Sequence, residues 1–209
     1  MGFFPTKLDA DTIMSSAYTI YENVTGKLPL VGSTDDLARD YLMNDGSLDE
    51  KIDSLIRWQV AKTAASGFAS GVPGGFTMAV SIPAGLAAAL YVQLRMAAAV
   101  AYMRGYDINN DRVKTFGICC LVGDEAMNVL KDAGAQIAMN VAKTAIKEIS
   151  KETINAINKA VGMRLVTKFG STGIVNLGKT VPILGGVVGR AMDAASTYAV
   201  GKAAKQVFG

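Results

Sequence analysis

Residues 63–94 read TAASGFASGVPGGFTMAVSIPAGLAAALYVQL and contain no charged residue. Lys62 precedes this stretch and Arg95 follows it. A membrane-spanning helix needs roughly 20 apolar residues, so a stretch of this length would be ample for one. The stretch is nevertheless rich in Ala, Gly and Ser rather than in Leu, Ile and Val, and Pro73 and Pro83 interrupt it. We therefore expect it to be buried, and its composition leaves open whether protein or lipid surrounds it.

A glycine- and proline-rich turn divides the stretch into two parts. Residues 71–75 read GVPGG, a composition that a helix interior does not tolerate. Residues 76–81 then predict a short apolar helix. Pro83 suits the first position of a longer helix, where its missing amide N–H is not needed, and Gly105 suits the cap that follows Arg104. This longer helix would be about 33 Å long at 1.5 Å per residue. Its many alanines would let neighbouring helices approach it closely on every side.

Helix signals also cover the rest of the chain. Ser47 and Glu50 have the spacing of a capping box, and the helix that they open places Ile52, Leu55 and Ile56 on one face. The other expected helices run from Asp9 or Asp11 to about 24, and over 35–43, 124–131, 136–149, 151–168 and 187–207. Alternating strand patterns of useful length are missing from the sequence. The pattern predicts one compact all-α domain over residues 1–209, with N-terminal helices in 1–59, built around the apolar Gly/Ala-rich central helical hairpin.

Residues 111–122 fit two structures. Asn110 can cap a helix there, whereas the apolar run that contains Cys119 and Cys120 can equally form a buried strand, because periodicity does not separate the two. Gly123 ends the segment in either case. Neighbouring cysteines rarely form a disulfide, so we interpret this pair as two small buried hydrophobic residues in a reducing, cytoplasmic compartment.

Composition argues against catalysis. Half of the 209 residues are hydrophobic, 19% are charged, and histidine is absent from the sequence. The lack of histidine excludes Ser-His-Asp and Cys-His pairs, His-ligated metals and the commonest general base near neutral pH. The first residues also lack the basic and apolar regions of a secretory signal peptide. We expect a cytoplasmic protein that is not an enzyme and has neither a cofactor nor a metal.

Charge is distributed unevenly along the chain. Residues 1–62 hold ten acidic and six basic residues, whereas residues 63–209 hold fifteen basic and eight acidic ones. Within that second part, residues 131–209 hold eleven basic and four acidic residues. A basic half is typical of a protein with an anionic partner, and it also occurs as a merely solvated helical surface. We expect an anionic membrane surface or an apolar ligand, with a membrane protein as a further partner, and no nucleic acid.

One basic ridge is the candidate for such a surface. Its members follow one another at helical spacing: Lys143, Lys147, Lys151, Asn155 and Lys159. Glu148 and Glu152 flank the ridge and weaken its field, so a solvated face is the alternative interpretation.

Other candidate positions combine small residues with one buried cation. Gly74 and Gly75 precede one Ala-rich segment and Gly185 and Gly186 another, so we expect these four to be turn or close-contact positions. Arg95 ends the uncharged stretch and is either a boundary residue with its head in water or the buried partner of an acid such as Asp124.

Two further patterns have structural explanations. Residues 173–180 read GIVNLGKT and satisfy the phosphate-loop pattern, yet Pro182 interrupts the helix that should follow and the loop interior holds bulky residues. We therefore expect no nucleotide there. Asp124 and Glu125 follow Gly123 at the start of a helix, where acids are expected for capping and dipole reasons.

A family resemblance covers much of the chain. The segment GVPGGFTMAVSIPAGLAAALYVQLRMAAAVAYMRGYD resembles the signature region of the EcsC family, in its Gly-Pro-Gly-Gly turn, its Ile-Pro-Ala entry and its Ala-Tyr-x-x-Gly-Tyr end. The segment CLVGDEAMNVLKDAG and the positions around Lys179, Pro182 and residues 195–198 resemble later blocks, so the resemblance spans roughly 60–209. Gly85 stands where the family often has an Asp. The family is named for a component associated with a bacterial ABC transporter system.

The resemblance implies a bacterial, hydrophobic, membrane-associated or lipid-binding accessory protein, and it implies no reaction. We expect it in the cytoplasm or at the inner face of the membrane. The alternative is a membrane-inserting, pore-forming-like protein whose central apolar hairpin leaves the rest of the fold. Vesicle binding without leakage would favour the first hypothesis, and leakage would favour the second.

Overall fold

The computed structural model describes residues 8–26, 33–66, 81–135, 146, 148–173 and 185–209. Within these ranges the chain forms helices and no strand, which confirms the all-α prediction. The elements are α1 (Ala10–Thr25), α2 (Thr34–Leu42), α3 (Leu48–Ser66), α4 (Ala84–Met103), α5 (Asp111–Cys119), the 3-10 helix η2 (Cys120–Glu125), α6 (Ala126–Asp132), α8 (Lys151–Gly173) and α9 (Gly185–Val207).

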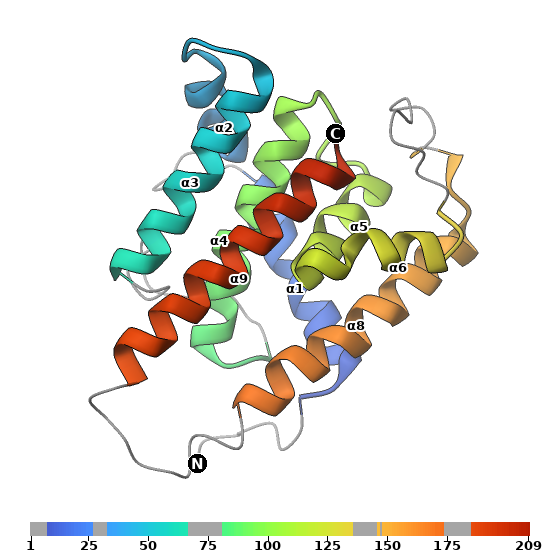
Figure 1. Cartoon of the computed structure of the whole chain (residues 1–209). Coiled ribbons are helices and arrows are strands. Elements are labelled where there is room, and N and C mark those ends of the chain that lie inside the picture. The colour runs from blue at the N-terminus through green and yellow to red at the C-terminus, as the bar shows by residue number, and fades with distance from the viewer. Residues whose placement is uncertain (1–7, 27–32, 67–80, 136–145, 147, 174–184) are drawn as a thin grey trace.

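Helix α4 is the centre of the fold. It contacts α1, α2, α3, α5 and α9, and Figure 1 shows it behind α9, with α3 on one side and α5, α6 and α8 on the other. From Ala87 to Ala101 every side chain except that of Arg95 is buried. The predicted burial on all sides is therefore correct, and for this part of the uncharged stretch the surroundings are protein.

The helices begin where the sequence signals predict. The Asp9 carboxylate accepts a hydrogen bond from the Thr12 amide at 2.7 Å, and Ser33 forms a capping box with Asp36 at the start of α2. Ser47 and Glu50 make the predicted reciprocal bonds before α3, with the Ser47 amide donating to the Glu50 carboxylate at 2.7 Å. Each bond satisfies an amide that the helix itself leaves free.

Pro83 differs by one position from the prediction. It is the residue before α4, with φ −55° and ψ 140°, and its carbonyl accepts a hydrogen bond from the Ala87 amide at 2.9 Å. The extended ψ angle excludes it from the first helical position, so α4 is 20 residues long. Gly105 closes the helix with a φ of 78°, as expected for a left-handed cap.

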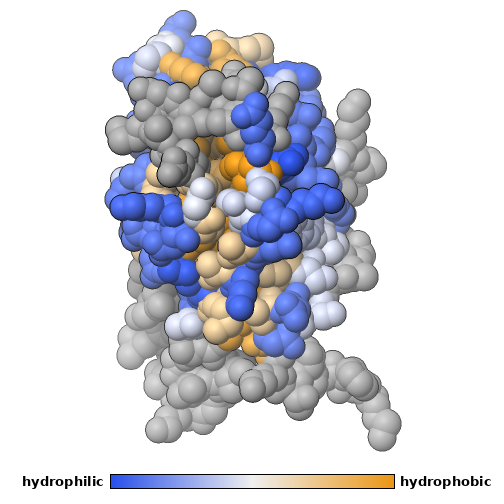
Figure 2. Space-filling view, turned by 90° about the vertical axis from the view of Figure 1, so that its right-hand side faces the viewer, coloured by the Kyte–Doolittle hydropathy of each residue, from blue (hydrophilic) through white to orange (hydrophobic). Residues whose placement is uncertain are grey.

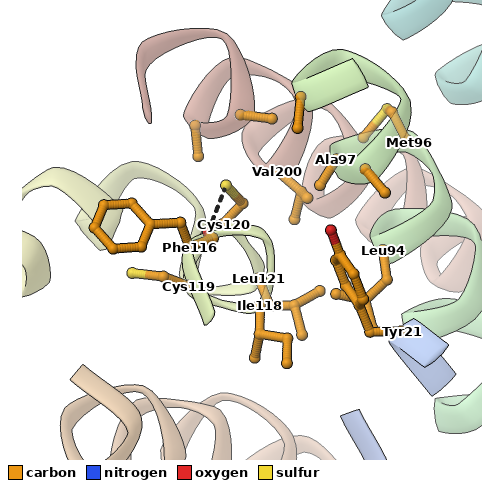
Figure 3. Close-up of a cluster of buried hydrophobic side chains, with 14 of the residues drawn as sticks. Tyr21, Leu94, Met96, Ala97, Phe116, Ile118, Cys119, Cys120, Leu121 and Val200 are labelled. Atoms are coloured by element: carbon orange, nitrogen blue, oxygen red, sulfur yellow. Dashed lines mark hydrogen bonds between the residues drawn. The ribbon is translucent and has the colours of Figure 1, made fainter. Parts of the chain in front are cut away.

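Residues 111–122, for which the sequence fits a helix or a strand, are helical. The Asn110 side chain accepts hydrogen bonds from the Arg112 and Val113 amides and starts α5, which continues into η2. Gly123 interrupts η2 with a φ of 64°, so the predicted break is also correct. Cys119 and Cys120 lie in the core, near Phe116 and Leu121, and Figure 3 shows Tyr21 pointing its hydroxyl toward Ala97 and Val200.

Glycines allow the outer helices to lie close to their neighbours. A Cβ on Gly201 of α9 would lie 2.6 Å from Cγ2 of Ile56 on α3, and Lys205 of α9 bonds Asp53 of α3 at 2.8 Å. These two contacts show that α3 and α9 run antiparallel. On α8, Gly162 lies against Ala10 and Met14 of α1 in the same manner.

Candidate functional site

The predicted site residues do not form one constellation in the described part of the chain. Gly74, Gly75, Lys143 and Lys147 lie outside the described residues. Gly185 and Gly186 are the first two residues of α9, so the helix begins two residues earlier than predicted and they are helical rather than turn residues.

Arg95 links α4 to the start of α2. Its guanidinium is half-buried and donates to the Ser33 carbonyl at 3.5 Å. Burial lowers the pKa of this guanidinium, while the nearby Tyr91 and Asp36 act in the opposite direction. Of the two alternatives for Arg95, the pairing with Asp124 is wrong, because Asp124 lies on η2 and pairs with Lys202 of α9 at 3.2 Å. Arg95 therefore connects α4 to the N-terminal cap of α2.

Many cations of residues 131–209 hold helices together. Arg164 of α8 pairs with Glu125 at 2.6 Å, and Lys205 of α9 pairs with Asp53. The Lys168 ammonium donates to the Leu121 carbonyl at 3.0 Å, and burial lowers the pKa of Lys168. In the described part of the chain these three cations therefore stabilise contacts between helices, and their positive charge is partly offset by Glu125 and Asp53.

Part of the predicted ridge remains at the surface. Lys151, Asn155 and Lys159 are exposed on α8, beside the exposed Glu148 and Glu152. The pKa of Glu152 is lowered by hydrogen bonds from its own backbone and from Ser150. A carboxylate held in its charged form opposes an anionic partner, so this ridge is a weak electrostatic surface.

The two cysteines are chemically inactive in this environment. Both are free and fully buried, and desolvation raises the pKa of Cys119 to about 12 and that of Cys120 well above its ordinary value. The thiolate is the reactive form of cysteine. No group of three His, Cys, Asp or Glu residues able to hold a metal occurs in the described ranges.

The phosphate-loop pattern has the wrong element before it. Its first residue, Gly173, is the last residue of helix α8, whereas a phosphate loop follows a strand. The remaining residues of the pattern, 174–180, lie outside the described ranges.

Four exposed residues near the end of α3 and at the start of α4 are small and uncharged. Figure 1 shows the starts of α4 and α9 in the lower part of the molecule and the end of α3 above them, on the left. Ala64 near the end of α3 is exposed, and so are Pro83, Ala84 and Gly85 at the start of α4. We call these four residues the uncharged end. The uncharged stretch therefore reaches the surface here, although most of α4 is buried.

The outer face of α3 was missed by the sequence analysis. Trp58 is 54% exposed, and the Lys62 ammonium lies 5.5 Å from the centre of its ring. Arg57 is exposed beside it. The signal for this position is its spacing: Trp58 follows the buried Ile56 by two residues, about 200° around a helix, and so points outward.

Another face carries a mixed surface. Figure 2 shows the side of the molecule that lies to the right in Figure 1, where apolar residues gather along the middle between hydrophilic flanks. We assign no function to this band.

Four buried polar side-chain atoms have no hydrogen-bond partner in the part of the chain that the structure describes. They are the Tyr21 hydroxyl, Oε1 of Gln93, Nε of Arg104 and Oγ1 of Thr197. Nε2 of Gln93 donates to Ser196 of α9 at 3.1 Å. These atoms weaken the core rather than mark a reaction site, because each loses its bonds to water on burial.

Comparisons place the chain in a family. The sequence model of the EcsC protein family matches residues 33–209, so the similarity begins at α2, earlier than the resemblance over 60–209 indicates. Curated proteins and solved structures gave no match. Because the family match covers well over half of its length, the chain belongs to the EcsC protein family.

Proposed function

We propose that this EcsC family protein is a non-catalytic accessory protein that binds the cytoplasmic face of a membrane without crossing it. The observation that carries the proposal is the uncharged end, where Ala64 and residues 83–85 are exposed. An apolar end on a chain with charged sides favours contact with a lipid surface or an apolar ligand. On family grounds we propose an ABC transporter system as the membrane-protein partner.

The composition of the chain supports a binding role rather than catalysis. The sequence has no histidine, and the two buried thiols have pKa values raised well above neutrality. The described acids at Asp124 and Glu125 serve ion pairs with Lys202 and Arg164. The interactions of these acids and thiols in the described part of the chain include no nucleophile paired with a base.

Insertion of α4 into the bilayer is the second candidate. In the described ranges α4 alone is long and apolar enough to cross a membrane, yet 78% of its most apolar window is buried within the protein. Five other α-helices and the 3-10 helix η2 contact it in the described part of the chain. Moving α4 into lipid would therefore expose the surfaces of all six, a change comparable to unfolding. Because domains are stable by only about 5–15 kcal/mol, insertion would require lipid to compensate for the whole core. Peripheral binding preserves the fold.

Flotation with vesicles tests the proposal. The protein is mixed with vesicles of phosphatidylcholine alone or with phosphatidylglycerol, both loaded with a fluorescent dye. We expect the protein to float with the vesicles and the dye to stay inside. Dye release on binding would favour the insertion of α4, and failure to float with either vesicle would reject a membrane role.

A charge variant tests the uncharged end. Ala84→Glu adds an acid to the exposed first turn of α4, where a helix tolerates acids well, so the fold is expected to persist. The variant should float less with anionic vesicles. Ala156→Glu adds the same charge to an exposed position of α8 and should float like the parent protein. Equal flotation of all three proteins would show that the membrane contact does not involve the uncharged end.

A further inference from the structure

We infer that the protein contacts an anionic bilayer through the outer face of α3, with Trp58 at the level of the lipid headgroups. This inference rests on the proposed membrane association and assigns the surface that makes it. We name the exposed residues Arg57, Trp58, Ala61 and Lys62 the α3 anchor.

The packing of α3 produces this face. Ile52, Leu55, Ile56 and Gln59 are buried on the opposite side, where α3 meets α4 and α9. Trp58, Ala61 and Lys62 follow at spacings of three and four residues, so they share one stripe on the outer surface. The Lys62 ammonium lies over the Trp58 ring at 5.5 Å from its centre. An aromatic ring and cations thus occupy the same patch.

The α3 anchor differs from a single exposed aromatic residue because cations lie beside its tryptophan. After Asp53 the sequence has no Asp or Glu until Asp107, while Arg57 and Lys62 occur in this interval. The last acid of α3, Asp53, is paired with Lys205. After Asp53, α3 itself therefore holds two exposed cations, Arg57 and Lys62, and no acid.

The opposite end of α3 has the reverse charge. Asp40, Asp45, Asp49 and Glu50 are exposed around its start. Figure 1 shows this start at the top of the molecule and the end of α3 lower down, on the left. An anionic surface would repel the upper end and attract the lower half, which orients the molecule with the uncharged end toward the lipid.

An anionic bilayer fits these residues better than an aqueous partner of the same charge. Tryptophan concentrates at membrane interfaces because its ring is apolar and its N–H bonds to headgroups, and Lys and Arg side chains reach lipid phosphates beside it. The α3 anchor also adjoins the uncharged stretch, which begins at residue 63. A bilayer offers both an anionic layer and an apolar layer within a few ångströms.

The chain has a single tryptophan, so its fluorescence reports on this position alone. We expect the emission of Trp58 to shift to shorter wavelength on anionic vesicles, and lipids brominated near the headgroup end of their chains to quench it. Added salt should reduce both effects, since the attraction is screened over about 8 Å at physiological ionic strength.

Matched variants separate this surface from others. Arg57→Glu with Lys62→Glu should weaken partitioning into anionic vesicles by at least about 30-fold, the factor for losing two cation contributions at the bilayer. Lys151→Glu with Lys159→Glu makes the same change at exposed positions of α8 and should have little effect. Trp58→Ala should also weaken partitioning, whereas Tyr198→Ala, at a 57% exposed aromatic residue of α9, should not. Unchanged thermal melting of each variant verifies that the fold persists.

The possible results distinguish a failure of the α3 anchor from a failure of the proposed membrane association. If the protein floats with anionic vesicles while Trp58 neither shifts nor is quenched, the α3 anchor is wrong and membrane association stands. If partitioning into anionic vesicles falls more in the double variant on α8 than in the double variant on α3, the contact lies on α8 and the inference is overturned. If the parent protein floats with no vesicle, the membrane role and the anchor both fail.

Discussion

The Cα of Gly201 on α9 lies so close to Ile56 of α3 that a Cβ would sit 2.6 Å from Cγ2 and 3.0 Å from Cγ1 of the isoleucine. Both atoms belong to the branched, stiff part of the side chain, and Ile56 is buried. The pair therefore sets how closely the two antiparallel helices approach.

Gly201→Ala should destabilise the protein by about 1–3 kcal/mol, the usual cost of forcing extra atoms into a packed core. The measurement is the midpoint of urea unfolding. Gly85→Ala is the control, because nothing lies within 4 Å of a Cβ there. That variant should be neutral or more stable by up to about 1 kcal/mol, since alanine favours a helix over glycine. Equal midpoints for the two variants would contradict close packing at Gly201.

A second close contact joins α5 to α1. A Cβ on Gly117 would lie 2.7 Å from Cε2 of Tyr21, whose ring is fully buried. Gly117→Ala should therefore cost about 1–3 kcal/mol of stability. In a Tyr21→Leu background the clash with the ring disappears, so the same substitution should cost clearly less. A double-mutant cycle measures this coupling, and a coupling energy near zero would show that the ring is not what the new methyl group meets.

Two buried threonines offer a matched test of hydrogen-bond satisfaction. Oγ1 of Thr197 has no partner in the described part of the chain, whereas the Thr115 hydroxyl donates to the Asp111 carbonyl at 3.1 Å and lies 2.8 Å from the Tyr18 hydroxyl. Thr197→Val should raise stability by about 1 kcal/mol, because it removes an unsatisfied polar atom at nearly constant volume. Thr115→Val should lower stability by a similar amount. If both lowered stability equally, Thr197 would have a partner, such as an ordered water.

Local signals were sufficient to predict most of the helices that the structure describes, whereas residues 111–122 fitted a helix and a strand equally. The absence of charge over residues 63–94 identified the element that occupies the centre, because only a helix buried on all sides needs no polar face. Caps such as Asp9, Ser33 and Asn110 act within three residues of themselves, so their bonds can be read directly from spacing. Even the position of Pro83 was predicted to within one residue.

Tertiary partners were not predictable in this way. Asp124 was a reasonable partner for Arg95 by charge alone, yet η2 places it beside Lys202 of α9. The basic half looked like a surface because the sequence could not show that Glu125 and Asp53 neutralise Arg164 and Lys205. Ion pairs between distant segments depend on how helices pack, and spacing along the chain carries little of that information.

The buried thiols and phenol predict a loss of stability in alkali. Burial raises the pKa of Cys119 to about 12, and it also raises the pKa values of Cys120 and Tyr21 well above their ordinary values. In the unfolded chain a thiol loses its proton near pH 8.5 and a phenol near pH 10. Between pH 8.5 and about 12 the unfolded state therefore binds fewer protons than the folded state, and the free energy of unfolding falls as the pH rises.

Urea unfolding at pH 7.5 and pH 10 measures this effect. Each thiol should contribute a loss of up to about 2 kcal/mol at pH 10, because that pH lies about 1.5 units above the pKa of an exposed thiol. Cys119→Ala with Cys120→Ala should be less stable than the parent at pH 7.5, since the substitutions leave cavities. The difference in stability between the two pH values should nevertheless be smaller in this variant, because both thiols are gone. A loss at pH 10 that is as large in the variant as in the parent would mean that the thiols of the folded protein ionise as readily as exposed ones, and that α5 opens to solvent well before the protein unfolds.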